Sequence, residues 1–313
     1  MKKTLIALAV LASGAAFAQS SVTLYGQIDI GYSKTNVPAK DASSALGQSN
    51  GATNFHTPTV FGLKGSEDLG GGLKANFNFQ TGGQDMETGA TTLAFSRESW
   101  VGISGNFGST RIGRTSSVAT QAMAAFDLNG IAATSAMSNV GISPVLWYGS
   151  SRRSSQFQYS TNDMSGFSAG VGIVLSGDNA SKGTYQGRVN YSNGPIAVGA
   201  NFETKRNDAA RTAYAVAGSY DFGAAKVSAG YVVSETEALG KGMHIGVKAP
   251  LGAAYVGAQY AKNTTTKDSA IEFLAGYNLS KRTALYLDAV RVNYSNSATT
   301  DKTMYGVGVL HAF

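Results

Sequence analysis

Hydrophobic and polar residues alternate with a period of two along most of the chain after Gln19. Within residues 72–80, one strand face would carry Leu73, Ala75, Phe77 and Phe79, and the other Lys74, Asn76, Asn78 and Gln80. The same alternation recurs in residues 167–176 and 185–191. Because successive side chains of a strand point to opposite faces, the pattern predicts strands with one apolar and one polar face. Alternation alone does not separate a membrane barrel from a soluble sandwich of two sheets.

The lengths of the connections favour the barrel. Short turns rich in Gly, Asp and Asn lie at residues 67–72, 106–109, 161–166, 192–195, 221–225, 249–253 and 279–283. Longer polar loops lie between them, near residues 34–56, 82–93, 116–150, 177–183, 205–211, 235–240, 263–269 and 295–302. Short turns on one rim and long loops on the other are typical of transmembrane barrels. These connections predict an all-β, 16-stranded antiparallel transmembrane β-barrel with both chain ends on the periplasmic side.

Closure explains why an even number of strands is expected. Lipid cannot hydrogen-bond a free strand edge, so every backbone N–H and C=O group has to pair between strands. Strands of about ten residues cross a thin outer membrane when they are tilted. A ring of this size leaves an aqueous lumen instead of a packed centre.

The first residues have the form of a secretory signal peptide. Lys2 and Lys3 precede an apolar stretch at residues 5–11, and small residues follow at 16–18. The apolar stretch is short compared with the roughly 20 residues of a membrane-spanning helix. We expect residues 1–18 to be removed and residues 19–313 to form the barrel. No later apolar run is long enough for a helical span.

Composition agrees with a surface that does not wholly face water. The chain has 39 Gly, 15 Tyr and 14 Phe, and only 14% of its residues are charged, against roughly 25% in a typical soluble domain. It has no cysteine, so a stapled secreted domain is excluded. Without Lys2 and Lys3, 23 basic and 19 acidic residues leave a formal charge of +4. No run of Lys or Arg exceeds two residues, and nucleic acid is not an expected partner.

Several blocks of sequence resemble the general porins of Gram-negative β-proteobacteria and their neisserial relatives. They are SVTLYGQIDIGY (21–32), FGLKGSEDLGGGLKANFNFQTG (61–82), WVGISGNFGSTRIGR (100–114), YDFGAAKVSAGY (220–231), GYNLSKRTALY (276–286) and GVGVLHAF (306–313). The resemblance implies a homotrimer of outer-membrane barrels, each with a water-filled channel for passive diffusion of small hydrophilic solutes and ions. It also implies that the third extracellular loop, here about residues 116–150, folds inward and narrows the lumen.

The resemblance extends to the ends of the barrel and to its surroundings. Phe313 is similar to the terminal aromatic residue by which the barrel-assembly machinery recognises such proteins. Outer-membrane lipid and lipopolysaccharide are the implied neighbours of the outer wall. The family usually carries Ser-Arg where this chain has Thr59 and Val60. With one basic side chain missing from the lumen wall, only a weak preference for anions is expected.

Strand parity selects the basic residues that would line the lumen. The inward positions carry Lys64, Arg111, Arg152, Arg188 and Lys226. Arg114 and Arg153 have outward parity, but both lie at strand ends, where a bulge could turn them inward. Arg97 is out of phase with an inward position, so parity does not place it.

The long third loop adds one charge to this set. Residues 116–150 contain a single acid, Asp127, and no Lys or Arg. We expect Asp127 to face Arg111 and Arg152 across the bore. The resulting transverse field would orient polar solutes and modestly favour anions.

Two other functions have to be weighed against a general channel. His56, His244 and His311 lie in separate segments without metal-ligand spacing, and the G-x-S-x-G match at residues 47–51 lacks the strand and helix of a nucleophile elbow. We therefore expect no enzyme, cofactor or metal, with an inward His244 as the one candidate for a barrel esterase. A substrate-specific channel or an adhesin on the same barrel stays open, although Trp100 and Trp147 are the only tryptophans available for an aromatic track.

Overall fold

The computed structural model describes residues 21–36, 44–47, 57–84, 93–142, 151–175, 183–205, 212–234 and 240–313. One antiparallel sheet contains all the strands of this part of the chain. The strands are β1 (Ser21–Thr35), β2 (Ser44–Gly47), β3 (Val60–Gly70), β4 (Leu73–Gln80), β5 (Glu98–Gly105), β6 (Gly108–Ser116), β7 (Arg152–Ser160), β8 (Phe167–Val174), β9 (Thr184–Asn193), β10 (Ile196–Lys205), β11 (Ala213–Asp221), β12 (Lys226–Val233), β13 (Lys241–Leu251), β14 (Ala254–Asn263), β15 (Ser269–Asn278), β16 (Thr283–Asn293) and β17 (Lys302–Ala312). The expected signal peptide at residues 1–18 lies outside the described residues.

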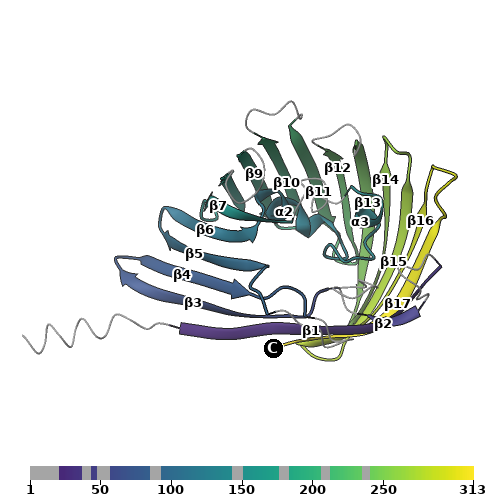
Figure 1. Ribbon diagram of the computed structural model, residues 1–313, viewed down its shortest axis with the longest axis horizontal. Coiled ribbons are helices and arrows are strands. Elements are labelled where there is room, and N and C mark those ends of the chain that lie inside the picture. Colours follow the sequence, from purple (N-terminus) through teal and green to yellow (C-terminus); the bar gives the residue numbers. More distant parts are fainter. Residues whose placement is uncertain are drawn as a thin grey trace, which may run out of the picture.

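The sheet closes on itself through its first strand. β1 pairs with β3 over residues 21–27 and with β17 over residues 27–35, and each other strand of the ring pairs with its neighbours in sequence (Figure 1). The four-residue β2 pairs with β1 and lies within the first predicted loop, where no strand was expected. Without β2 the ring has 16 strands, which confirms the predicted fold class.

The two faces of the wall have opposite polarity, and the outer face is the apolar one. Val22, Val101 and Ile245 are more than half exposed, whereas Gln259, Glu272 and Asp288 are at most 1% exposed. This arrangement inverts the pattern of a soluble protein and is expected where the outer face meets lipid. The predicted alternation is confirmed for residues 167–175, since Phe167, Val171, Ile173 and Leu175 are exposed and Val174 is buried.

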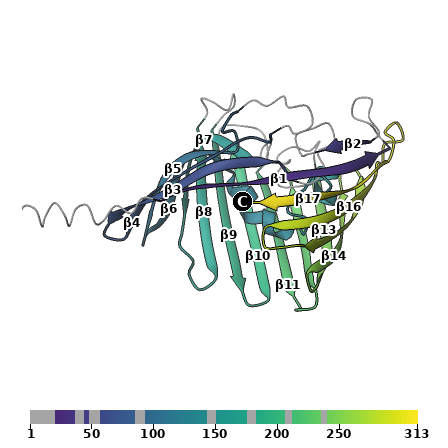
Figure 2. The ribbon, with the colours of Figure 1, turned by 90° about the horizontal axis from the view of Figure 1, so that it is seen from below.

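Tight turns join the strands at one edge of the wall. Gly194, between β9 and β10, has φ +55°, and Gly252, between β13 and β14, has φ +68°. Only glycine adopts such angles without steric cost, which explains the Gly-rich turns of the sequence. Figure 2 shows the β9–β10 turn at the lower edge of the wall. The rings of Tyr220 and Phe222 lie beside the β11–β12 turn with centroids 4.6 Å apart, as expected of an aromatic girdle.

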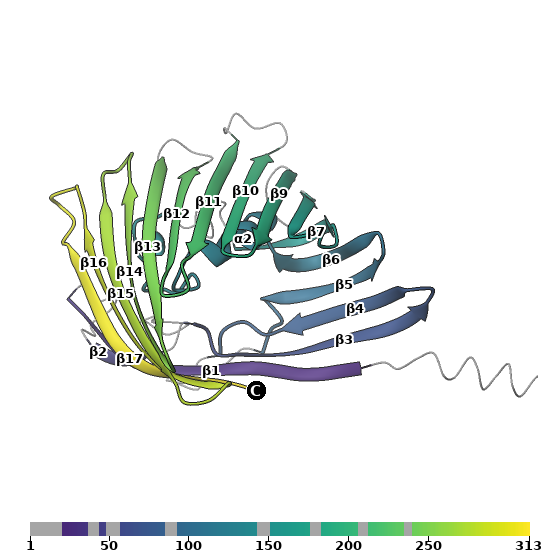
Figure 3. The ribbon, with the colours of Figure 1, turned by 180° about the vertical axis from the view of Figure 1, so that it is seen from behind.

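The third long connection folds into the barrel. Residues 117–142 form α2 (Val118–Met123), the 3-10 turn η1 (Ala124–Phe126) and α3 (Ala136–Asn139), which lie on the concave side of the strand wall (Figures 1 and 3). We call residues 117–142 the inner loop. Its apolar side chains pack on small inward residues of the wall, namely Ala213, Ala215, Ala217, Ala261 and Ala270. The inward folding is confirmed for this part of the predicted loop, and residues 143–150 lie outside the described residues.

The helices of the inner loop are short, and their ends depend on local caps and on the wall. The Ser117 side chain accepts a hydrogen bond from the Thr120 N–H and so caps α2. Within the described residues, none of the helices has the length and apolar character needed to cross a membrane.

The last residue completes the ring against the first strand. The Phe313 N–H donates to the Gly26 carbonyl over 3.0 Å, and the Gly26 N–H donates to the Phe313 carbonyl over 3.1 Å. A Cβ atom on Gly26 would lie 2.5 Å from both the Phe313 ring and the Val60 carbonyl oxygen. Glycine is therefore required at this seam by the close approach of three chain segments.

We predict that Gly26→Ala destabilises the barrel by about 1–3 kcal/mol, because the added methyl group overpacks the seam. The measurement is the unfolding midpoint in urea of protein refolded into detergent. Gly218→Ala is the matched control, since its Cβ would meet no atom closer than 3.3 Å. Equal midpoints for the two variants would contradict the steric role of Gly26.

Candidate functional site

Two carboxylates of the lumen wall hold the inner loop in place. Glu272 of β15 accepts hydrogen bonds from the Asn129 side chain and from the Ala136 N–H, the latter over 3.0 Å. Asp288 of β16 accepts one from the Thr134 hydroxyl over 3.1 Å. Glu272 and Asp288 are fully buried, so these bonds replace the water that the carboxylates would otherwise bind. The wall acids therefore fix the path of the loop across the lumen.

The structure corrects the expected position of Asp127. Its carboxylate is 5% exposed and accepts hydrogen bonds from the Ser135 hydroxyl over 2.6 Å, the Asn129 N–H over 3.0 Å and the Gln259 amide over 2.9 Å. It therefore does not face Arg111 and Arg152 across the bore. Asp127 points into its own turn because its carboxylate accepts the hydrogen bonds of nearby polar groups in the turn after η1.

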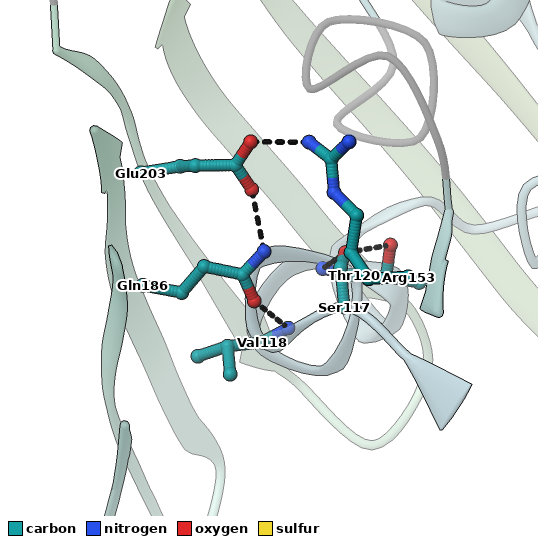
Figure 4. Close-up of polar contacts among 6 residues, drawn as sticks. All are labelled: Ser117, Val118, Thr120, Arg153, Gln186 and Glu203. Carbon is teal, nitrogen blue, oxygen red and sulfur yellow. Dashed lines mark hydrogen bonds and ion pairs between the residues drawn. The ribbon is translucent and has the colours of Figure 1, made fainter. Parts of the chain in front are cut away.

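Arg153 anchors the start of the inner loop through a chain of polar contacts (Figure 4). Its guanidinium forms an ion pair with Glu203 of β10, which is fully buried. The second Glu203 oxygen accepts from the Gln186 amide over 2.7 Å, and the Gln186 oxygen accepts from the Val118 N–H over 2.9 Å. This chain connects the beginning of β7 to the first residue of α2.

An irregularity in the strands accounts for the inward position of Arg153. The pairing of β6 and β7 shifts register between Gly113 and Thr115. On β7, Ser155 lies within this shift, between the paired residues Arg153 and Gln156, and has φ +48°. A bulge of this kind reverses the parity of the residues beyond it, which is how the nominally outward Arg153 meets a lumen carboxylate.

Basic residues crowd the rim where β5, β6 and β7 meet. The Arg97 Nε donates to the Gln80 side chain over 3.1 Å. Burial, with the like charge of Arg152 nearby, lowers the pKa of Arg97 to about 10. Arg97 thus stays protonated at neutral pH. Strand parity did not predict the position of Arg97, and its contact with the inward-facing Gln80 places it on the lumen side.

Arg114 and Glu98 complete this rim. Arg114 donates to the Ser96 carbonyl and, over 2.7 Å, to the Ser154 hydroxyl. Glu98 accepts from the Trp100 indole N–H over 2.8 Å. One acid therefore lies among the rim arginines and partly offsets their charge.

The wall formed by β1 and β3–β6 carries two cations that rest on aromatic rings. The Lys64 Nζ lies 4.9 Å from the centroid of the Tyr25 ring, and the Arg111 Cζ lies 4.7 Å from that of Trp100. Neither cation has a carboxylate within 4 Å among the described residues. Stacking on a ring face stabilises a cation while leaving its N–H groups free.

The remaining predicted cations lie elsewhere on the inner wall. Arg188 of β9 donates to the Asn190 side chain over 3.0 Å and sits near Arg111. Lys226 opens β12, where its register partner is Lys248 of β13. Lys248 donates to the Leu128 carbonyl over 3.2 Å and so binds the inner loop. Lys226 is thus not brought together with Lys64 and Arg111.

The family described as Gram-negative porin matches residues 4–297. This chain belongs to that family. The barrel of this porin resides in the outer membrane.

Relatives and solved structures agree with the assignment. Outer membrane porin protein 32 of Delftia acidovorans is 38% identical over 63% of this chain and 58% of its own length. An outer membrane porin protein of Bordetella pertussis is 34% identical over 56% of this chain and 49% of its own length. This chain thus spans about half the length of these relatives. The anion-selective porin from Comamonas acidovorans superposes with a TM-score of 0.78 and 27% identity, over 94% of this chain and 100% of that one.

A more distant structure shares the fold alone. The loop-deleted form of OmpT, an outer membrane protein of Vibrio cholerae, has a TM-score of 0.68 and 15% identity over 94% of this chain and 99% of that one. The barrel therefore persists where most of the sequence differs.

Sequence reasoning missed the wall groups that hold the inner loop of this porin. These are Gln186, Glu203, Gln259, Glu272 and Asp288. The available signal was parity, since each has at least one exposed apolar neighbour in its strand, and Glu272 has two, Ile271 and Phe273. Their loop partners could not be inferred, because those contacts join segments more than 60 residues apart.

His244 of β13 is the histidine considered as a candidate for a barrel esterase. His244 is 4% exposed and faces inward, but neither ring nitrogen has a hydrogen-bond partner there. No three His, Cys, Asp or Glu side chains in the same residues cluster as metal ligands. His56 and most of the G-x-S-x-G match lie outside the described residues.

We predict that Glu272→Gln loosens the inner loop, because the amide NH₂ would meet the donors that now bind a carboxylate. The expected cost is about 1–3 kcal/mol of unfolding free energy, with larger fluctuations of the open-channel current. Chemical unfolding and single-channel recording measure the two effects. Glu67→Gln, at an exposed position near the β3–β4 turn, is the control. A quiet channel of unchanged stability would show that Glu272 does not hold the loop.

Proposed function

We propose that this porin forms a water-filled channel for passive diffusion of small hydrophilic solutes and ions across the outer membrane. The observation that carries the proposal is the polar inner wall, with an inner loop bonded to one side of it. The loop packs on β8–β12 and β14–β16. On the wall of β1 and β3–β6, Lys64 and Arg111 contact aromatic rings and no carboxylate of the described residues, so their charges can act on passing solutes.

A weak preference for anions follows from the distribution of free charge. Lys64, Arg111 and Arg188 lack a carboxylate partner within the described residues, whereas Asp127, Glu272 and Asp288 are engaged by the loop. Mobile ions therefore meet more uncompensated positive than negative charge. The similarity to an anion-selective porin supports the same sign. Val60, buried where the family usually has a basic residue, keeps the preference modest.

Charge removal tests this preference. Replacing Arg111 and Arg188 together with Gln should shift the reversal potential in a salt gradient toward the cation side. The expected change in the anion-to-cation permeability ratio is on the order of twofold, because salt screens charge over roughly 8–10 Å. Planar-bilayer recording measures it. Lys281→Gln, in the exposed turn between β15 and β16, serves as control. An unchanged reversal potential for the double variant would refute the assignment of these cations to the lumen.

The assembly of the porin belongs to the same proposal. We infer a homotrimer whose outer apolar walls contact lipid and lipopolysaccharide, and whose chain is exported after removal of residues 1–18. Phe313, at the barrel seam, is the proposed signal to the barrel-assembly machinery. The exposed apolar side chains that surround the ring support a membrane setting for all of these contacts.

Current steps test the trimer. A single inserted particle should close in three equal steps under high voltage, because each barrel would carry its own channel. Closure in one step would indicate a monomer. Cross-linking of the detergent-solubilised protein provides an independent count of subunits.

A further inference from the structure

Two basic side chains lie on the apolar outer face of the barrel. Lys34 of β1 is exposed and follows the buried, inward-facing Ser33. Arg291 of β16 is exposed and lies between the buried Val290 and Val292. Successive side chains of a strand alternate between its two faces, so both cations point away from the lumen. Passage of solutes through the channel therefore does not explain them.

Both cations lie near the long-loop edge of the wall, on either side of β17. Lys34 is the second-last residue of β1, and Arg291 is the third-last residue of β16. In register, Lys34 pairs with Tyr305 of β17, and Arg291 pairs with Thr303. A charge on the lipid face is costly at the middle of the bilayer and is tolerated at the interface. This height places the two cations among lipid headgroups.

Neither cation has an acidic partner among the residues that the structure describes. No carboxylate in these residues lies within 4 Å of Lys34 or Arg291. The Arg291 Nε donates to the Asn293 side chain over 3.2 Å, which leaves the two terminal nitrogens for another acceptor. Outward positions near the same edge of β8–β11 carry apolar side chains instead, namely Leu175, Tyr185, Phe202 and Tyr214. The charge at β1 and β16 is thus not a feature of the whole ring.

An apolar groove of about 730 Å³ lies in the outer face of β14–β17 and β1, which adjoin in Figure 3. Two rows of paired residues cross from β15 to β1 and line it. One row is Ala275, Leu287, Val307 and Tyr32, and the other is Tyr277, Leu285, Val309 and Ile30. Ala254 and Ala275 are small among these larger side chains, so the wall is hollowed here. A groove of this volume accommodates a sizeable apolar segment of a ligand.

The groove leads to the two cations. Tyr32 of the groove and Lys34 are successive outward residues of β1. On β16, one outward residue, the small Ala289, separates Leu287 of the groove from Arg291. An apolar hollow thus ends at a pair of positive charges. This arrangement is complementary to an amphiphile that has an apolar chain and an anionic headgroup.

We propose that the groove binds the lipid end of one lipopolysaccharide molecule, with an acyl chain in the hollow and phosphate groups on Lys34 and Arg291. Arg291 offers the planar fork that suits a phosphate, and Lys34 offers a compact charge. Two cations on separate strands favour a diphosphorylated headgroup over a lipid with one phosphate. Because the groove crosses from β1 to β17, the bound lipid contacts both strands of the closing seam and stabilises the closed ring. The site rests on the proposed outer-membrane setting and gives it one defined lipid position.

Diphosphoryl lipid A is the probe, added to porin that has been refolded in a neutral detergent. The wild-type barrel should retain one lipid in native mass spectrometry, and the lipid should slow its unfolding in urea. A ligand that binds only the folded state raises the folding equilibrium constant about 100-fold at about 100 times its Kd. Replacing Lys34 and Arg291 together with Gln should weaken binding about tenfold or more, because charge-assisted contacts are lost. Lys34→Arg should retain most of the affinity.

Two further variants separate the site from general effects on the barrel. Lys241→Gln is the matched control, since Lys241 is exposed at the same edge and no residue of β13 lines the groove. It should bind the lipid as the wild type does. Ala275→Phe fills the hollow while keeping the outer face apolar, and it should lose binding in a folded barrel. Wild-type affinity in both Ala275→Phe and the double variant would overturn the site.

Other lipids decide the chemical class of the occupant. Lipid A without phosphate groups should neither be retained nor slow unfolding. Phosphatidylglycerol, which has a single phosphate, should bind about tenfold more weakly than diphosphoryl lipid A. Equal binding of phosphatidylglycerol would overturn the assignment to a diphosphorylated lipid. Equal slowing of unfolding in the wild type and in every variant would indicate unspecific packing of lipid and would also overturn the site.

Conductance separates this site from the proposed channel. The groove lies on the outer face, so the double variant of Lys34 and Arg291 should conduct potassium chloride in planar bilayers as the wild type does. A conducting wild type that retains no lipid A would overturn the lipid site and leave the channel intact. A wild type that retains lipid A without conducting would instead overturn the channel.

Discussion

Hydrocarbon offers the peptide backbone no hydrogen-bond partner, so every strand edge of this porin has to be paired within the chain. That requirement explains why β1 divides its pairing between β3 and β17 and why Phe313 returns to Gly26. Pairing between strands satisfies the backbone whatever the side chains are, so the same requirement is compatible with the inverted surface. The wall can then be apolar toward lipid and polar toward water.

A ring of 16 strands is too wide to be filled by the side chains of its own wall. The inner loop fills part of the lumen, and the inward side chains of the wall beneath it match the loop in polarity. Where the loop is apolar, as at Phe126 and Met137, it packs against inward alanines. Where the loop presents backbone N–H groups, as at Val118 and Ala136, the wall provides Gln186 and Glu272. The inner wall thus has a side bonded to the inner loop and a side that the loop leaves uncovered.

Local patterns were sufficient to predict the ring but not its interior. Period-two alternation gave the faces of residues 72–80 and 167–176, and the spacing of turns gave the strand count, because both depend on near neighbours. The environment of Asp127 and the partner of Arg153 depend on the fold of the inner loop and on one bulge. Such contacts join distant segments and leave no periodic trace. Asp127 was accordingly misplaced, and Glu203 was not found before the fold was known.

The seam at Gly26 has a consequence for the order of folding. Its partner, Phe313, follows the final strand of the ring, so the cylinder cannot be completed until β17 has been delivered. Hairpins along the wall join segments close in sequence and can form early, whereas the closing contact has the greatest loop-closure cost in the ring. A chain whose export stopped short of β17 would keep two bare edges. Closure of the ring therefore requires that all of its strands, from β1 to β17, are present.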